Sequence, residues 1–132
     1  MIITPITPRF SETNGAAHID HTVIPVWFDA GRRELMRLFS PELNARDWPL
    51  ALVNLSVDFK KELFYDRDVE VHTAVEKIGR SSFTLREEVH QSGQVCAVGQ
   101  CTFVHFDYAN GSSMEINDSV RASLAEHLVS AD

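Results

Sequence analysis

Cysteine is scarce in this sequence of 132 residues, and glycine and proline are also few. The two cysteines, Cys96 and Cys101, stand five residues apart in a predicted strand, so their side chains are expected on opposite faces of it. Such a pair cannot easily form a disulfide, because the two Cβ atoms point away from each other. The sequence therefore predicts two buried, reduced thiols, as is usual in a cytosolic protein.

Long apolar runs and an excess of basic residues are absent as well. No stretch approaches the roughly 18 apolar residues of a membrane-spanning helix. The first residues have neither the basic start nor the apolar centre of a signal peptide. Lys and Arg number 12 against 19 Asp and Glu, which gives a net charge of −7. This charge argues against nucleic acid or an anionic membrane as the main partner. We therefore expect a cytoplasmic protein that binds neither.

Apolar residues recur with helical spacing over residues 23–39 and predict one long helix. Its apolar face is so wide that other elements must cover most of the helix. Asp20 or Thr22 can cap its start, Pro25 is tolerated in the first turn, and Pro41 follows its end. Asp29, on the narrow polar strip, is expected to pair with an arginine. The apolar face comprises Ile24, Trp27, Phe28, Gly31, Leu35, Leu38 and Phe39.

The apolar period changes from 3.6 to 2 after Pro49 and predicts strands. They are expected at residues 54–60, 69–76, 83–89 and 95–108, with a further strand at 6–12. In the strand at 54–60, Leu55, Val57 and Phe59 form the half-buried face. Glu87 interrupts the apolar face of its strand and is expected to mark a β-bulge. A short amphipathic helix is expected at 118–129.

One long apolar helix followed by consecutive strands predicts an α+β domain. A five-stranded antiparallel sheet has one apolar face, and the helix needs a cover, so a sheet that curls around the helix satisfies both. This is the hot-dog fold. Without a linker or an internal repeat, residues 1–132 are expected to form a single domain.

Three segments, in this order, resemble motifs of the acyl-CoA thioesterases of the 4-hydroxybenzoyl-CoA thioesterase type. Residues 9–21 read RFSETNGAAHIDH, which is similar to the family's aromatic residue followed by Thr-Asp-x-x-Gly-His-Val-Asn-Asn. Residues 28–32 read FDAGR, similar to Phe-Glu-x-Ala-Arg, and residues 78–83 read IGRSSF, where the family has Gly-x-Ser-Ser. Each motif is weak alone, whereas their order and spacing match across nearly the whole chain.

The resemblance implies hydrolysis of an acyl-CoA thioester without a metal ion or any cofactor other than the coenzyme A of the substrate. It implies a homodimer whose sheets pair edge to edge, often doubled to a homotetramer, with the thioester bound at the dimer interface. The helix start would face the thioester carbonyl, and the backbone amide of His21 would donate to the oxyanion. Arg80, Ser81 and Ser82 would contact coenzyme A; otherwise they form an ordinary turn.

The sequence departs from the family pattern at its catalytic carboxylate, which is Asn14 here, while Ala17 replaces a glycine. An amide cannot take a proton from water at neutral pH, so a contribution of roughly 10²–10⁴-fold has to come from another group. Asp20 and His18 are candidates, as is the neighbouring Glu12. The alternatives are that Asp20 caps the helix and that His18 is a hydrogen-bonded structural residue.

Asn14 also supports a second hypothesis, a non-catalytic module that binds acyl-CoA or an acyl carrier and has lost the catalytic carboxylate. A hot-dog hydratase is disfavoured, because its Asp-x4-His pattern would place the aspartate at Thr13. A zinc site formed by His18, Asp20 and His21 is also disfavoured, since no other cluster in the chain obviously adds ligands.

Overall fold

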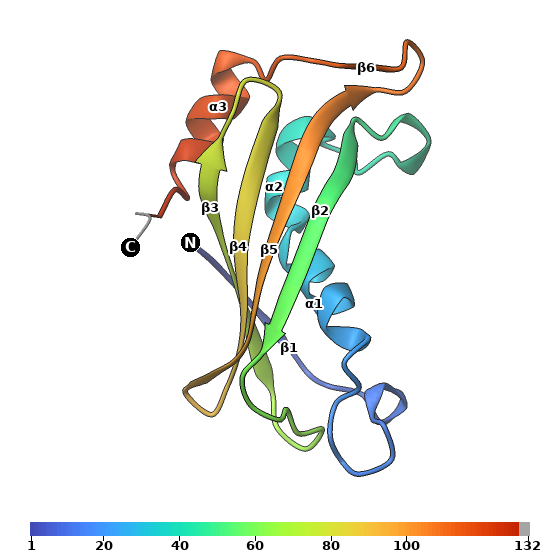
Figure 1. Ribbon diagram of the computed structural model, residues 1–132, viewed down its shortest axis with the longest axis vertical. Helices are drawn as coiled ribbons and strands as arrows, with labels where there is room; N and C mark the ends of the chain where they lie inside the picture. Colours follow the sequence, from blue (N-terminus) through green and yellow to red (C-terminus); the bar gives the residue numbers. More distant parts are fainter. Residues whose placement is uncertain (130–132) are drawn as a thin grey trace.

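The structure is a computed structural model that describes residues 1–129, and its main feature is a curled antiparallel sheet wrapped around two consecutive helices (Figure 1). Five strands follow the order β1-β3-β4-β5-β2, and a short sixth strand, β6, pairs with β5. This is the α+β hot-dog fold that the sequence predicts. The strands are β1 (Ile2–Ile6), β2 (Leu50–Phe59), β3 (Val69–Ile78), β4 (Ser82–Gln91), β5 (Gln94–Asp107) and β6 (Ser112–Ser113).

The helices inside the sheet are α1 (Val23–Gly31) and α2 (Arg33–Phe39), and α3 (Asp118–Ala125) packs at one end of the sheet. Two 3₁₀ turns, η1 (Phe10–Glu12) and η2 (Ala45–Asp47), precede α1 and β2. The core fills the space between the helices and the concave face of the sheet. Phe28 of α1 packs there among Val71, Val89 and Ala97, and Leu35 of α2 packs in a second cluster. Among residues 1–129, no helix is long and apolar enough to cross a membrane.

The helix predicted as continuous over residues 23–39 is divided at Arg32. The N–H of Arg32 donates to the carbonyl of Asp29 at 3.1 Å, a tighter 3₁₀-type bond that ends α1. Gly31 lies so close to β3 that an added Cβ would stand 2.7 Å from Val71 Cγ1. The apolar period cannot reveal this break, because the two halves keep facing the same sheet.

The β-bulge predicted at Glu87 is wrong. The pairing of β4 runs without a shift through Glu87, and the extra residue is Glu76 on β3. Glu87 instead points inward like its apolar neighbours and is fully buried. Arg32 neutralises it with two hydrogen bonds of 2.7 and 2.8 Å, so the charged residue keeps its place in a regular strand.

Both chain ends differ from the prediction. The first strand spans Ile2–Ile6 rather than residues 6–12, because the alternation that pairs with β3 ends at Ile6 opposite Val69. Phe10, expected in that strand, lies in η1 and is 74% exposed. The last helix ends at Ala125 rather than at residue 129, so Leu128 lies beyond it, half exposed.

Strand β2 is an edge strand, which alters the burial predicted for it. Leu55 and Phe59 were expected on the half-buried face but are 40% and 54% exposed. Only Val57 of that set packs against the core. Among residues 1–129, β2 pairs with β5 alone, so its other edge carries unpaired backbone groups beside exposed apolar side chains.

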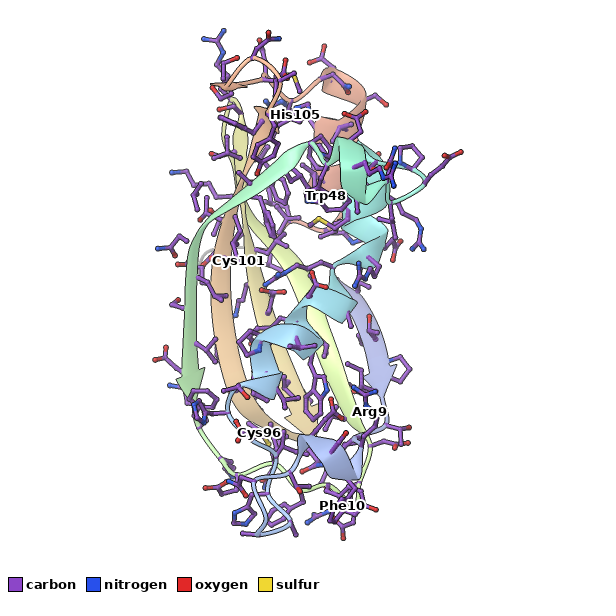
Figure 2. The ribbon with its side chains drawn as sticks, turned by 90° about the vertical axis from the view of Figure 1, so that its right-hand side faces the viewer. Arg9, Phe10, Trp48, Cys96, Cys101 and His105 are labelled. Atoms are coloured by element: carbon purple, nitrogen blue, oxygen red, sulfur yellow. The ribbon has the colours of Figure 1, made fainter. Side chains whose placement is uncertain are left out.

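Both cysteines are free and buried, as predicted, but they do not lie on opposite faces. The pairing of β4 with β5 shifts between Val89 and His90, which makes Cys96 an extra residue on β5. The shift resets the alternation, so Cys96 and Cys101 both enter the core, in different clusters. Figure 2 shows them at different heights along the sheet.

Candidate functional site

The loop that precedes α1 is held in place by backbone pairing with two other segments. Thr13 and Ile19 form an isolated bridge that closes the loop, and His18 forms another with Phe64. Within the loop, Gly15 and Ala17 adopt positive φ values of 93° and 62°. Ala17 therefore keeps the left-handed backbone conformation that explains a glycine in the family pattern. The loop presents its residues beside the start of α1.

Asp20 bonds the residues at the helix start, where Thr22 is the N-cap residue. The Oδ1 atom of Asp20 accepts the N–H of Thr22 at 2.9 Å and the Thr22 hydroxyl at 2.8 Å, while its carbonyl accepts the N–H of Val23 at 3.0 Å. These bonds from Thr22 lower the pKa of Asp20 below its ordinary value. Asp20 therefore remains a carboxylate that holds the N-cap residue Thr22 in place, and is not the N-cap itself.

A hollow of about 450 Å³ opens at this helix start. Of the predicted catalytic residues, Asn14 and His21 border it, and His18 and Asp20 do not. The His21 amide N–H, the predicted oxyanion donor, has no acceptor among residues 1–129, whereas the next amides along the chain donate within the helix start. The His21 imidazole is exposed, and its Nδ1 lies 3.5 Å from Asp20 Oδ1.

Asn14 lies on the exposed rim with part of its hydrogen-bonding capacity already used. Its Oδ1 accepts the N–H of Ala16 at 3.3 Å, and its own backbone N–H donates to the carbonyl of His18 at 3.0 Å. No acceptor within residues 1–129 takes its side-chain NH₂ group. Asn14 can therefore donate a hydrogen bond into the hollow, although it cannot act as a base.

Two of the candidate bases have other partners. Glu12 is buried, where one oxygen accepts the indole N–H of Trp27 at 3.0 Å and the other accepts the N–H of Arg9 at 2.7 Å. It anchors α1 to η1. The His18 ring stands edge-on to Phe64, with Nδ1 3.5 Å from a carboxylate oxygen of Glu62. These contacts match the structural interpretation of His18 more closely than a catalytic one.

The end of β2 and the segment after it complete the hollow, and this was not predicted from the sequence. Strand β2 contributes Phe59, and the segment contributes Lys60, Lys61, Glu62 and Leu63. The run of charged residues directly after an alternating strand was the one available signal. It gave no indication of proximity to the helix start, because that proximity arises where Ile19 N–H bonds the Leu63 carbonyl at 2.8 Å.

Arg80, Ser81 and Ser82 lie at the β3–β4 turn, at the opposite end of the sheet from the helix start (Figure 1). The Arg80 side chain is 84% exposed and 3.8 Å from a Glu115 oxygen. The Ser81 carbonyl accepts the N–H of His105 at 2.7 Å. In Figure 2, His105 and Trp48 mark this end, whereas Arg9 and Phe10 mark the other.

A larger hollow of about 970 Å³ also lies at the end of His105 and Trp48. The loop from Phe39 to Pro49 and the end of β5 line it. Its described lining residues include none of the predicted catalytic residues. We therefore place the candidate reaction site at the smaller hollow, which Asn14 and His21 border.

The possible ligand atoms of His18, Asp20 and His21 do not all lie close together. Within residues 1–129, one group of three histidine, cysteine or acidic side chains has its ligand atoms close enough together to hold an ion. That group is His72, Glu88 and His90 on the sheet, and it includes none of the helix-start residues.

Residues 8–124 match the family model described as "Thioesterase-like superfamily". The chain belongs to this superfamily. Its structure is similar to that of a predicted thioesterase from Bacillus stearothermophilus, with 42% identity, a TM-score of 0.95, and coverage of 99% of this chain and 98% of that one. An Aquifex aeolicus protein named "Putative esterase" is 30% identical over 115 residues, covering 85% of this chain and 88% of that protein.

Structures of lower sequence identity show a likeness of fold alone. A thioesterase from Thermus thermophilus, complexed with coenzyme A and Zn, is 18% identical, with a TM-score of 0.83 and coverage of 93% of this chain and 96% of that one. The matches confirm the thioesterase resemblance that the ordered motifs indicate in the sequence.

Proposed function

We propose that this chain hydrolyses an acyl-CoA thioester to the free acid and coenzyme A. Membership of the superfamily supports thioester chemistry in general. The observation that carries the specific proposal is His21, which borders a hollow of about 450 Å³ and whose amide N–H, just before α1, has no acceptor among residues 1–129. Hydrolysis needs a hydrogen-bond donor that faces the thioester carbonyl, because negative charge develops on the carbonyl oxygen as water adds.

The proposed oxyanion donor is the His21 amide, aided by the positive end of the α1 dipole. One such donor contributes roughly 3–4 kcal/mol to the stability of the transition state in comparable acyl-transfer sites. The Asn14 side-chain NH₂ is placed to support the same oxygen or to orient the attacking water. This role is consistent with an amide where the family pattern has a carboxylate.

The proposed general base is the His21 imidazole, oriented by Asp20. It is the one histidine that both borders the hollow and faces a carboxylate, with Nδ1 3.5 Å from Asp20 Oδ1. Its Nε2 would take a proton as the water oxygen bonds to the carbonyl carbon. The tetrahedral intermediate would then break its C–S bond, and the leaving thiolate would receive that proton.

The proposed assembly is a homodimer paired along β2. The free edge of β2 carries Leu52, Val53, Leu55 and Phe59, which are 48%, 59%, 40% and 54% exposed. A second copy would satisfy the unpaired backbone groups and cover these side chains together. Because β2 ends at Phe59 on the rim of the hollow, the partner would also enclose the reaction site.

Antiparallel pairing of the two β2 strands brings opposite ends of the two sheets together. The β3–β4 turn of the partner would then approach the helix-start end of this chain. This arrangement explains how Arg80, Ser81 and Ser82 could contact the coenzyme A of a thioester bound at His21, although they lie at opposite ends of one chain. Arg80 would offer its fork of donors to a phosphate.

A panel of short, medium, long and aromatic acyl-CoA substrates tests the proposal, with release of free thiol as the measurement. We expect turnover by the wild type and a loss of about 10²–10⁴-fold in kcat for His21→Asn, which keeps the backbone amide. His127→Gln, far from the hollow, is the matched control and should leave kcat unchanged. If no substrate releases thiol, the proposed reaction is wrong. If His21→Asn hydrolyses a substrate at the wild-type rate, His21 is not the base.

Asn14 supports a second candidate, a module that binds acyl-CoA without hydrolysing it. Its side-chain oxygen accepts the N–H of Ala16, as a residue with a purely structural part in the loop would. Asn14→Asp distinguishes the two. If a site for water is present, a carboxylate there should raise the rate; a module that binds coenzyme A tightly would show no turnover in either form.

A further inference from the structure

A cluster of two histidines and a glutamate lies on the convex face of the sheet, away from α1. His72 comes from β3, and Glu88 and His90 come from β4. Along both strands the neighbouring residues alternate into the core, with Val71 and Val89 buried, so these three side chains point outward. All three are partly buried, with 15–20% of each side chain exposed.

The strand register brings the three side chains together. His72 pairs directly with Glu88 across the two strands, and His90 follows Glu88 two residues later on the same face. The donor atoms of the three residues all lie within 4.8 Å of one another. The two paired strands fix the backbone at these three positions. The ligand atoms can therefore move only by rotation of the side chains.

The hydrogen-bonded atoms of the cluster lie closer together than two ligands of one metal ion and would have to separate by about 0.5 Å. Glu88 Oε1 and His90 Nε2 are 2.8 Å apart, and two donors on one tetrahedral zinc ion stand roughly 3.3 Å apart. The imidazoles of His72 and His90 stack with centroids 3.7 Å apart and planes at 5°. Both rings would have to rotate out of this stack, because an ion bound by an imidazole lies in the plane of its ring and the two planes are parallel here.

Space and charge beside the cluster favour a cation. A hollow of about 210 Å³ is bordered by His72, Glu88 and Arg86. Glu70, whose Oε1 lies 3.1 Å from His72 Nε2, adds a second carboxylate, and Arg86 bonds the other oxygen of Glu88 at 3.0 Å. With neutral imidazoles, two carboxylates and one guanidinium leave a net charge of −1.

We propose that His72, Glu88 and His90 bind one divalent cation of the zinc class on the convex face of the sheet. Two imidazole nitrogens and one carboxylate oxygen are ligands that suit Zn²⁺, Co²⁺ and Ni²⁺ rather than Ca²⁺ or Mg²⁺. Glu70 would orient His72 from outside the ligand set. The ion ties β3 to β4 and stabilises the fold, and it lies on the other face of the sheet from the thioester hollow.

Equilibrium dialysis of the full chain against Zn²⁺ at pH 7.5, and the visible absorption of the Co²⁺-loaded protein, test this proposal. We expect one ion per chain and an absorption band from a Co²⁺ ion with fewer than six ligands. His72→Gln and His90→Gln should each weaken binding by at least about tenfold and remove the band. Zn²⁺ should raise the Tm of the wild type and not that of His90→Gln.

The double variant His18→Gln/His21→Gln is the matched control, because it removes two histidines from the helix-start loop and should still bind one ion. Glu88→Gln provides a third ligand variant if a histidine substitution prevents folding, which circular dichroism would reveal. Absence of stoichiometric binding overturns the proposal. So does binding that survives in His72→Gln and His90→Gln, or binding that disappears in the helix-start control.

Discussion

Replacing Glu87 by glutamine removes one half of the buried ion pair that joins β4 to the junction of α1 and α2. In the folded protein, Arg32 Nε and Nη2 donate to the two Glu87 oxygens at 2.7 and 2.8 Å. The side chains of Arg32 and Glu87 are 5% and 0% exposed, so water replaces neither partner. Burial lowers the pKa of Arg32, but the hydrogen bonds and charge of Glu87 outweigh it and raise that pKa, so the arginine stays charged.

The expected loss is about 3–5 kcal/mol in the free energy of unfolding, because a buried guanidinium is left without its counterion. For a chain of this length, a loss of 3 kcal/mol corresponds to a fall of roughly 10 °C in Tm. Removing both charges with Arg32→Met/Glu87→Leu should cost much less than the two single changes combined, since no unpaired charge remains.

Urea unfolding at one protein concentration measures these quantities in the wild type, in Glu87→Gln, and in Arg32→Met, Glu87→Leu and their double variant, which complete the double-mutant cycle. Arg33→Gln is the matched control, because it removes an exposed ion pair and leaves Arg32 and its partners in place. The bond from Arg33 to Asp29 joins side chains that are 51% and 53% exposed, so its loss should cost less than about 1 kcal/mol. A loss below about 1 kcal/mol for Glu87→Gln, or additive losses in the double variant, would refute the reasoning.

Three further predictions concern the core and the helix start. Gly99→Ala should cost about 1–3 kcal/mol in urea unfolding, because the added Cβ would stand 2.4 Å from Phe28 Cε2; a neutral result would mean that the ring can move aside. Burial and the nearby Glu87 raise the pKa of the Cys101 thiol. Iodoacetamide should therefore modify Cys101 in urea and not in the native protein. Rapid labelling of Cys101 in the native protein would contradict this prediction. Because the pKa of Asp20 is lowered in the folded state, its contribution to stability is present above the unfolded pKa and lost as pH falls through the folded pKa. An NMR titration of the Asp20 carboxyl should show a midpoint below the ordinary aspartate value and a rise towards it in Thr22→Ala.

The order of elements and the location of the candidate site could be predicted from the sequence. A wide apolar face at helical spacing followed by two-residue alternation requires a sheet around a helix, whatever the details of the side chains. The ordered motifs around residues 9–21, 28–32 and 78–83 indicate the superfamily, and the match over residues 8–124 confirms it. Asp20 and Thr22 were recognised as possible caps, because an acceptor just before a helix satisfies free amides locally, and Thr22 is the N-cap residue.

The set of residues that border the hollow could not be predicted, because pairing between segments distant in the sequence brings them together. The segment from Phe59 to Leu63 reaches the helix start through the bond from Ile19 N–H to the Leu63 carbonyl. His72 and Glu88 become neighbours through the register of β3 and β4, and local spacing carries no information about register between strands.

Local sequence patterns thus determined which segments are helical or extended and which loop carries the candidate chemistry, since these depend on neighbours a few residues away. Only the tertiary structure decided that Glu87 is a buried partner of Arg32 rather than a bulge, and that β2 is an exposed edge. It also decided that His21, rather than His18, borders the hollow. Each of these outcomes depends on which distant segment fills the space beside a residue, and packing of the whole chain determines that.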